Sequence, residues 1–252
     1  MAFINKKILN NKILAAIFIY LIYLAIFYST WAINGADYKS IGKSEDTIRL
    51  WYALPTLIAS ISTIILITIL GWWRKVFFDF KKVSASWTFI LPVFIAILIF
   101  ANFTNIQIEN LTSGLIVWGM LGGIGVGFGE EIITRGSLLV GLRSKYSEGK
   151  VWLYSTLLFS LLHAPNVFFG LEFSNMIVQL LLAFIMGTAF YVIRRITGNL
   201  IIPIILHGLW DTSIFIPIAT GSQNLTLASI IIYPLAIVCS VPVLKKIWKK
   251  RL

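Results

Sequence analysis

Five ionisable side chains in the apolar part of the sequence have types that could take part in acid–base chemistry: Glu130, Glu131, Arg135, His163 and His207. A carboxylate can take a proton from water, and an imidazole can move a proton or stabilise developing charge. The chain has only two histidines, and both belong to this set. We therefore expect one catalytic site that brings together residues from three separate segments.

The spacing of the two glutamates predicts different roles for them. Glu131 and Arg135 are four residues apart, so on a helix they share a face and can form an ion pair. Glu130 points about 100° away from its neighbour. We expect Glu131 to neutralise Arg135 and Glu130 to remain available for chemistry.

The same spacing of four recurs around each histidine. Phe159 precedes His163 by four residues, which predicts packing of the aromatic ring against the imidazole. Asp211 follows His207 by four, which predicts that the carboxyl group orients that imidazole and sets its tautomer.

The elements that position these residues are membrane helices. Of the 252 residues, 58% are hydrophobic and only 12% are charged, with a mean hydropathy of +0.89. These values exclude a soluble or disordered chain and predict an all-α, polytopic membrane bundle. We expect eight spans, at about 13–33, 50–73, 86–104, 111–142, 151–166, 174–193, 198–216 and 225–244. The single cysteine, Cys239, excludes a disulfide framework.

The depth of the charged groups in the membrane supports a shared site. Counted from the basic residue at the end of each span, Glu130 and His163 are 13 residues away and His207 is 12. At about 1.5 Å per helical residue, all three lie roughly 18 to 20 Å from that end. Charges in the membrane interior are costly, which makes such a layer a functional-site hypothesis.

The basic charge of the chain predicts its orientation. There are 21 Lys and Arg against 10 Asp and Glu, a net charge of +11. On the eight-span topology 17 of the 21 lie on one side and only Lys39, Lys43 and Arg49 on the other, which predicts cytosolic termini. The positive charge then favours anionic lipid headgroups, and not nucleic acid, as its partner.

We divide the chain into residues 1–84, with two helices and a cytosolic loop, a catalytic membrane core at 85–220, and a last helix with a basic tail at 221–252. Glycines at 122, 123, 125, 127 and 129 form overlapping GxxxG pairs and predict close helix packing. Trp51 lies near a predicted span end, where we expect an interfacial anchor.

Three motifs in order carry a family resemblance. Residues 130–135 read Glu-Glu-Ile-Ile-Thr-Arg and resemble the EExxxR motif of the CAAX-protease and bacteriocin-processing (CPBP, or Abi) family of intramembrane proteases. Residues 159–163 resemble its FxxxH motif, and residues 207–211 its HxxxN/D motif, with Asp at the last position. The resemblance extends over about residues 85–215 and is to the type II CAAX prenyl endopeptidase-like members.

This resemblance implies an intramembrane endopeptidase of the glutamic type, without a cofactor. It implies that Glu130 activates water, that His163 positions or deprotonates this water, and that His207 and Asp211 stabilise the oxyanion. Glu131, Arg135 and Phe159 would support the site structurally. The implied substrate is a membrane-associated or lipidated peptide or protein, and the expected location is the plasma membrane.

Two other functions stay open at the level of sequence. Glu130, His163 and His207 could instead bind a divalent metal such as zinc, although no HExxH motif is present. The same helices could also form a non-catalytic immunity protein or scaffold. A proton-coupled transporter is less favoured because the chain has no paired halves.

Overall fold

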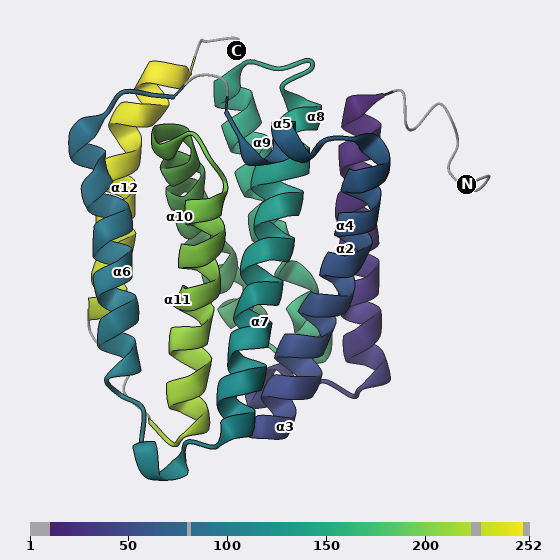
Figure 1. Cartoon of the computed structure of the whole chain (residues 1–252), viewed down its shortest axis with the longest axis vertical. Coiled ribbons are helices and arrows are strands. Elements are labelled where there is room, and N and C mark those ends of the chain that lie inside the picture. Colours follow the sequence, from purple (N-terminus) through teal and green to yellow (C-terminus); the bar gives the residue numbers. More distant parts are fainter. Residues whose placement is uncertain (1–10, 80–81, 223–227, 249–252) are drawn as a thin grey trace.

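The computed structural model describes residues 11–79, 82–222 and 228–248. In this part of the chain the regular structure is helical, and the β-structure is limited to one isolated bridge between Phe78 and Asn199. In chain order the elements are α2 (Lys12–Ile33), η1 (Tyr38–Ser40), α3 (Glu45–Thr47), η2 (Ile48–Ala53), α4 (Leu54–Leu70), α5 (Trp73–Phe77), η3 (Ser86–Phe89), α6 (Ile90–Phe103), η4 (Ile108–Asn110), α7 (Ser113–Glu131), η5 (Ile132–Ser137), α8 (Leu138–Leu142), α9 (Glu148–Leu161), η6 (Ala164–Phe169), α10 (Phe173–Thr197), α11 (Ile201–Ala219) and α12 (Ala228–Ile247). The long helices run side by side in one bundle (Figure 1). The predicted all-α fold is confirmed.

Within the described residues, seven helices are long and apolar enough to cross a membrane. They are Lys12–Ile33, Glu45–Leu70, Ser113–Leu142, Glu148–Phe169, Phe173–Thr197, Ile201–Ala219 and Ile230–Ile247. The remaining expected span, the third in chain order at 86–104, is a shorter apolar helix, Trp87–Phe103. The chain is thus an integral membrane protein with seven full-length candidate spans rather than eight.

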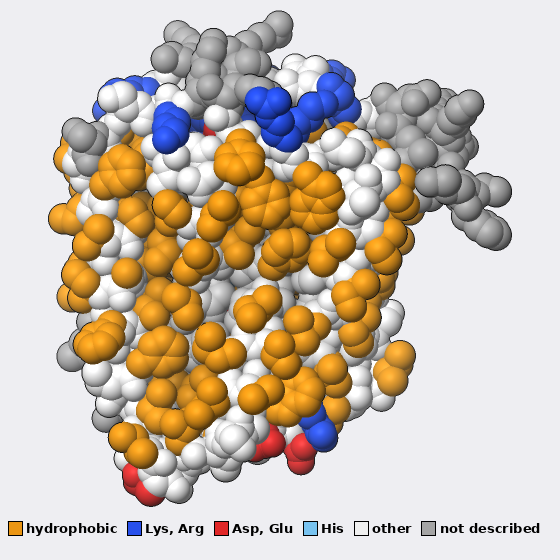
Figure 2. All heavy atoms as spheres, in the orientation of Figure 1, with side chains coloured by type: hydrophobic (Ala, Val, Ile, Leu, Met, Phe, Trp, Pro, Cys, Tyr) orange, Lys and Arg blue, Asp and Glu red, His pale blue; other side chains and the backbone are white. Residues whose placement is uncertain are grey.

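Charge is separated along the bundle. Figure 2 shows Lys and Arg gathered at one end, a wide hydrophobic band, and acidic side chains at the other end. Helix α2 begins and helix α12 ends at the basic end (Figure 1). The predicted basic positions Lys6, Lys7, Lys81, Lys249, Lys250 and Arg251 lie outside the described residues. Which side of the membrane the basic end faces stays a prediction.

The glycines of α7 allow it to pack closely against α11, as the GxxxG pattern predicted. A Cβ atom on Gly127 would lie 2.3 Å from the carbonyl oxygen of Ile204, and one on Gly208 would lie 2.3 Å from that of Gly123. Real Cβ atoms do not approach backbone so closely, so these positions require glycine. Because Gly208 follows His207 directly, this contact holds His207 beside the end of α7.

The basic end is held together by buried ion pairs around Asp79, which follows α5. Its carboxylate lies 2.8 Å from Arg143 Nη1 and 3.0 Å from Arg194 Nη2, and also pairs with Arg195. Burial acts to raise the pKa of Asp79, but the three guanidinium groups outweigh burial and hold this pKa well below its ordinary value. Arg194 also donates to the backbone carbonyl of Arg135, which links this network to the site-bearing segment.

Candidate active site

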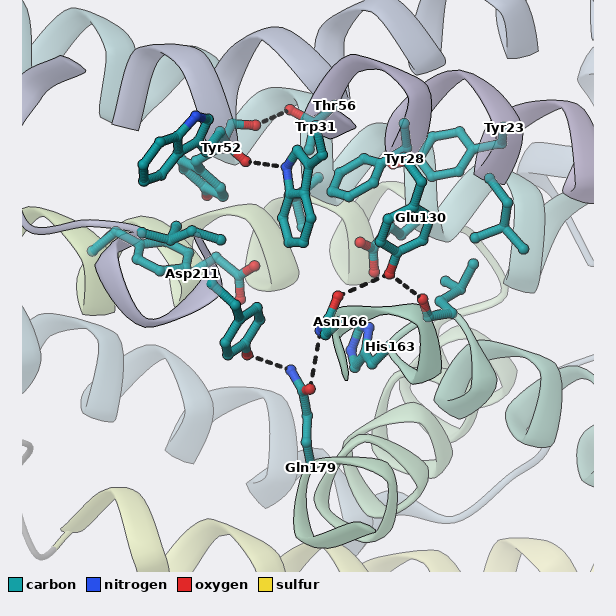
Figure 3. A pocket seen from close by; sticks show the side chains of 18 of the residues that line it. Tyr23, Tyr28, Trp31, Tyr52, Thr56, Glu130, His163, Asn166, Gln179 and Asp211 are labelled. Atoms are coloured by element: carbon teal, nitrogen blue, oxygen red, sulfur yellow. Dashed lines mark hydrogen bonds between the residues drawn. The ribbon is translucent and has the colours of Figure 1, made fainter. Parts of the chain in front are cut away.

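The predicted site residues meet in one cavity of about 360 Å³ inside the bundle. Glu130 from α7, His163 from the turn after α9, and His207 and Asp211 from α11 all line it. Figure 3 shows Glu130, His163 and Asp211 around this space. The prediction that three separate segments place these groups together is confirmed.

Glu130 takes part in no ion pair within the described residues. Its side chain lines the cavity and is 9% exposed, and its buried Oε2 atom has no hydrogen-bond partner there. A buried carboxylate normally has donors around it. A carboxylate at a cavity wall that lacks a donor can accept a hydrogen bond from a bound water or substrate.

Glu131 pairs with Arg135 as predicted, with 2.8 Å between Oε1 and Nη1 and both side chains fully buried. The same oxygen lies 2.9 Å from Nδ1 of His207. We expected Asp211 to orient His207, but no hydrogen bond joins these two residues in the described structure. That expectation is corrected: the carboxylate that orients His207 comes from α7 and not from one turn further along α11.

The Glu131 contact sets the tautomer of His207. An ionised carboxylate only accepts hydrogen bonds, so Nδ1 carries the hydrogen and Nε2 is the nitrogen left for other interactions. Neutral Nε2 can accept a proton, and in the doubly protonated ring it can donate one.

Phe159 packs between the charged groups. Its ring centroid is 5.6 Å from that of His163, as predicted, and 5.7 Å from that of His207. The Arg135 guanidinium lies over the same ring, 3.7 Å from the centroid, which is cation–π geometry. Phe190 stacks on the other side of His207 at 4.8 Å. These contacts restrict the rotation of both imidazoles.

The turn that carries His163 is fixed by a residue that the sequence analysis missed. The hydroxyl of Tyr28, on α2, donates to the carbonyl oxygen of Leu162 at 2.6 Å and reaches Oδ1 of Asn166 at 2.9 Å. The Leu162 carbonyl lies at the end of α9, where the helix offers it no partner. Tyr28 therefore caps the helix directly before His163.

Aromatic residues of the N-terminal helices form one wall of the cavity. Tyr23, Trp31, Trp51 and Tyr52 line it together with Tyr28. We expected an interfacial role for Trp51, whereas the structure places it in the cavity wall. The density of aromatic residues between positions 18 and 31 was the sequence signal for this wall, because ordinary lipid-facing helices are rich in aliphatic residues.

The metal-binding alternative concerns Glu130, His163 and His207, which line one cavity. In the part of the chain that the structure describes, no group of three or more His, Cys, Asp or Glu side chains is arranged to hold a metal ion. The metal-dependent alternative stays a prediction that chelation can test.

The sequence of this chain also resembles that of a known family. A family model described as "Type II CAAX prenyl endopeptidase Rce1-like" matches residues 112–213. The matched region contains all the site residues from Glu130 to Asp211, but not α2 or η2. No curated protein and no solved structure matches the chain.

Proposed function

We propose that this chain, whose residues 112–213 match the Rce1-like family model of type II CAAX prenyl endopeptidases, hydrolyses peptide bonds within the membrane by means of water activated by Glu130. The observation that supports this most strongly is the contrast between two adjacent carboxylates. Oε1 of Glu131 is occupied by Arg135 and His207, and Glu131 does not line the cavity, whereas Glu130 lines it and takes part in no ion pair within the described residues. Each carboxylate has one oxygen without a partner, but only that of Glu130 belongs to a cavity-lining residue. A general base needs such a free oxygen within reach of water.

In the proposed reaction, a water held by Glu130 and His163 attacks the carbonyl carbon of the scissile peptide bond. Glu130 takes one proton from the water as the new C–O bond forms. The tetrahedral intermediate then breaks its C–N bond, and Glu130 returns the proton to the leaving amine. The proton that Glu130 takes from the water is the one that it gives to the leaving amine, so the carboxylate ends the reaction in its starting form.

His207 and Asp211 are proposed to stabilise the negative charge on the carbonyl oxygen. The pairing of Nδ1 with Glu131 leaves Nε2 of His207 as the possible donor. Asp211 lines the cavity and can donate a hydrogen bond in its protonated form. Donors placed where charge develops are worth about 10²- to 10³-fold in rate each.

The substrate is proposed to be a membrane-associated or lipidated peptide, cleaved without a metal cofactor in the plasma membrane. The site lies among candidate membrane-spanning helices, which suits a substrate that is itself held at the membrane. The basic end of the bundle suits anionic headgroups on the cytosolic leaflet.

The test is cleavage by the purified full chain in lipid nanodiscs. A peptide library would be offered with and without a C-terminal farnesyl-cysteine, and products would be identified by mass spectrometry with and without a chelator. We expect defined cleavage that survives chelation. Absence of cleavage of every peptide would favour the immunity or scaffold function, and cleavage lost on chelation and restored by zinc would favour the metal-dependent one.

A further inference from the structure

A second cavity, of about 380 Å³, lies on the other side of the site residues. Five residues line both cavities: Tyr38, His163, Gln179, His207 and Asp211. These residues therefore form the boundary between two chambers. The catalytic groups thus stand at a junction rather than at the bottom of a single pocket.

The two chambers differ in chemistry. We name the first the aromatic chamber, because eight of its lining residues are aromatic, including Tyr23, Phe27, Tyr28, Trp31, Trp51 and Tyr52. The second chamber has fewer aromatic residues in its wall, five in all, beside Leu171, Val178, Leu182, Ala183 and Met186. Most of the aromatic wall comes from residues 23–52, outside the region that the family model matches.

A chain of hydrogen bonds crosses the boundary (Figure 3). Tyr28 reaches Asn166 at 2.9 Å, the Asn166 amide donates to Gln179 Oε1 at 3.0 Å, and Gln179 Nε2 donates to the Tyr38 hydroxyl at 2.6 Å. Tyr28 and Asn166 line only the aromatic chamber, whereas Gln179 and Tyr38 line both. The Gln179–Tyr38 hydrogen bond therefore lies at the boundary between the two chambers.

A carboxamide at this position matches the needs of a peptide backbone. In the membrane interior every backbone N–H and C=O of a bound peptide requires a partner. The Gln179 side chain offers one donor group and one acceptor, as a peptide bond does. It can exchange its bond to Tyr38 for bonds to an extended substrate chain.

One tyrosine hydroxyl favours a polar occupant of the aromatic chamber. Tyr23 lines this chamber, and its hydroxyl is buried and has no hydrogen-bond partner in the described structure. Buried hydroxyls are normally hydrogen-bonded. An isoprenoid chain brings no acceptor for this hydroxyl, whereas a peptide segment brings carbonyl oxygens.

We propose that the substrate binds as an extended peptide across both chambers, with an aromatic side chain in the aromatic chamber. Gln179 binds the backbone between the two chambers, and Trp31 determines the preference for the aromatic residue. This inference rests on the proposed function, since it places the scissile bond beside Glu130.

Binding is tested separately from cleavage with the full-length Glu130→Gln variant in nanodiscs. The binding probes are alanine decapeptides with Phe-Leu, Leu-Phe, Phe-Ala, Ala-Leu or Ala-Ala at the two central positions. For crosslinking, photoreactive benzoylphenylalanine replaces the Phe of these peptides. We expect mass spectrometry to find the crosslinks within residues 23–52. Crosslinks confined to α10 and α12, or equal binding of the Ala-Ala peptide, would overturn the inference.

Substitutions then test the two named residues. Trp31→Ala should weaken binding of the Phe peptides at least tenfold, and Trp31→Phe should bind them nearly as well as wild type. The matched control is Trp248→Ala, at an exposed position outside both chambers, and it should leave binding unchanged. Wild type should bind an amide peptide better than its central-ester analogue. Gln179→Leu should remove this preference, and the loop control Gln107→Leu should keep it.

The outcomes separate this inference from the proposed function. Crosslinking in the aromatic chamber without any cleavage by wild type would retain the inference and refute the protease. Cleavage whose sequence preference is unchanged in Trp31→Ala and Gln179→Leu would retain the protease and refute the inference. A farnesyl-cysteine peptide that displaces the Phe peptides and crosslinks within residues 23–52 would show that the aromatic chamber holds a lipid instead, which also refutes it.

Discussion

Glu131 and His207 lie 2.9 Å apart, between Oε1 and Nδ1, although 76 residues separate them in the chain. The same Glu131 oxygen lies 2.8 Å from Arg135. One carboxylate therefore neutralises a buried cation and orients an imidazole. A change at Glu131 should therefore affect both the neutralisation of Arg135 and the orientation of His207.

Replacement of Glu131 by Gln should lower both stability and activity. The amide leaves Arg135 as a buried charge without an anion, which typically costs about 3 to 5 kcal/mol. The double variant Glu131→Gln/Arg135→Gln should regain much of the stability but not the activity, because His207 still lacks its carboxylate. Thermal unfolding in detergent and peptide cleavage measure the two effects. Recovery of full activity in the double variant would show that Glu131 does not orient His207.

The control for this pair is Glu172→Gln. Glu172 forms an ion pair with Lys39 in which both side chains are exposed. Water screens such a pair, so its loss should leave the melting temperature almost unchanged.

Stability at low pH should depend on Asp79. Its pKa is below the ordinary value in the folded protein, so the stabilisation is fully present above the unfolded-state pKa of about 3.9 and is lost as the pH falls below it. Asp79→Asn should therefore be less stable than wild type at pH 7, and the difference should shrink as the pH falls below about 4. Unfolding midpoints measured between pH 7 and pH 3 test this, and a constant difference across that range would contradict it.

Contacts within one helix could be predicted from the sequence. The Glu131–Arg135 pair and the packing of Phe159 on His163 follow from the spacing of four residues, because the helical backbone fixes which side chains share a face. Membrane spans follow equally from hydropathy, except that residues 87–103 form a shorter helix than expected.

Contacts between helices could not be predicted in this way. The pairing of His207 with Glu131 depends on how closely α7 and α11 approach, and the Tyr28 cap depends on which face of α2 meets α9. Arg194 is one of the 17 basic residues that the sequence places on the cytosolic side, but the structure buries it fully against Asp79. In each case the partner lies far away in sequence, so spacing carries no information about it.

Asp211 distinguishes an oxyanion role from a metal-ligand role. If Asp211 donates to the oxyanion, Asp211→Asn should retain much of the activity, because the amide also donates hydrogen bonds. Asp211→Ala should lose about 10²- to 10³-fold in rate. Cleavage rates and bound-metal content are measured on the same preparations. Stoichiometric zinc in active wild type, lost together with activity in Asp211→Asn, would overturn the metal-free mechanism.

The membrane orientation is tested with single cysteines introduced into a Cys239→Ala background, since the native cysteine is buried. Positions Lys82 and Tyr146 should react from the cytosol, and Glu109, Glu172 and Ser222 from the opposite side. The predicted cytosolic C-terminus, which lies outside the described residues, would be tested with a tag. Labelling of Tyr146 from outside would invert the helix that carries Glu130.

Glu130→Gln tests the central claim most directly. The amide keeps the shape of the side chain but cannot accept the proton of water, and general-base catalysis contributes about 10²- to 10⁴-fold. We predict that this variant folds with the same melting temperature as wild type, binds the peptide substrate, and cleaves it at least about 10²-fold more slowly. Glu109→Gln, at an exposed position in the short helix η4, is the matched control and should cleave normally. Cleavage by folded Glu130→Gln at the wild-type rate would contradict the account.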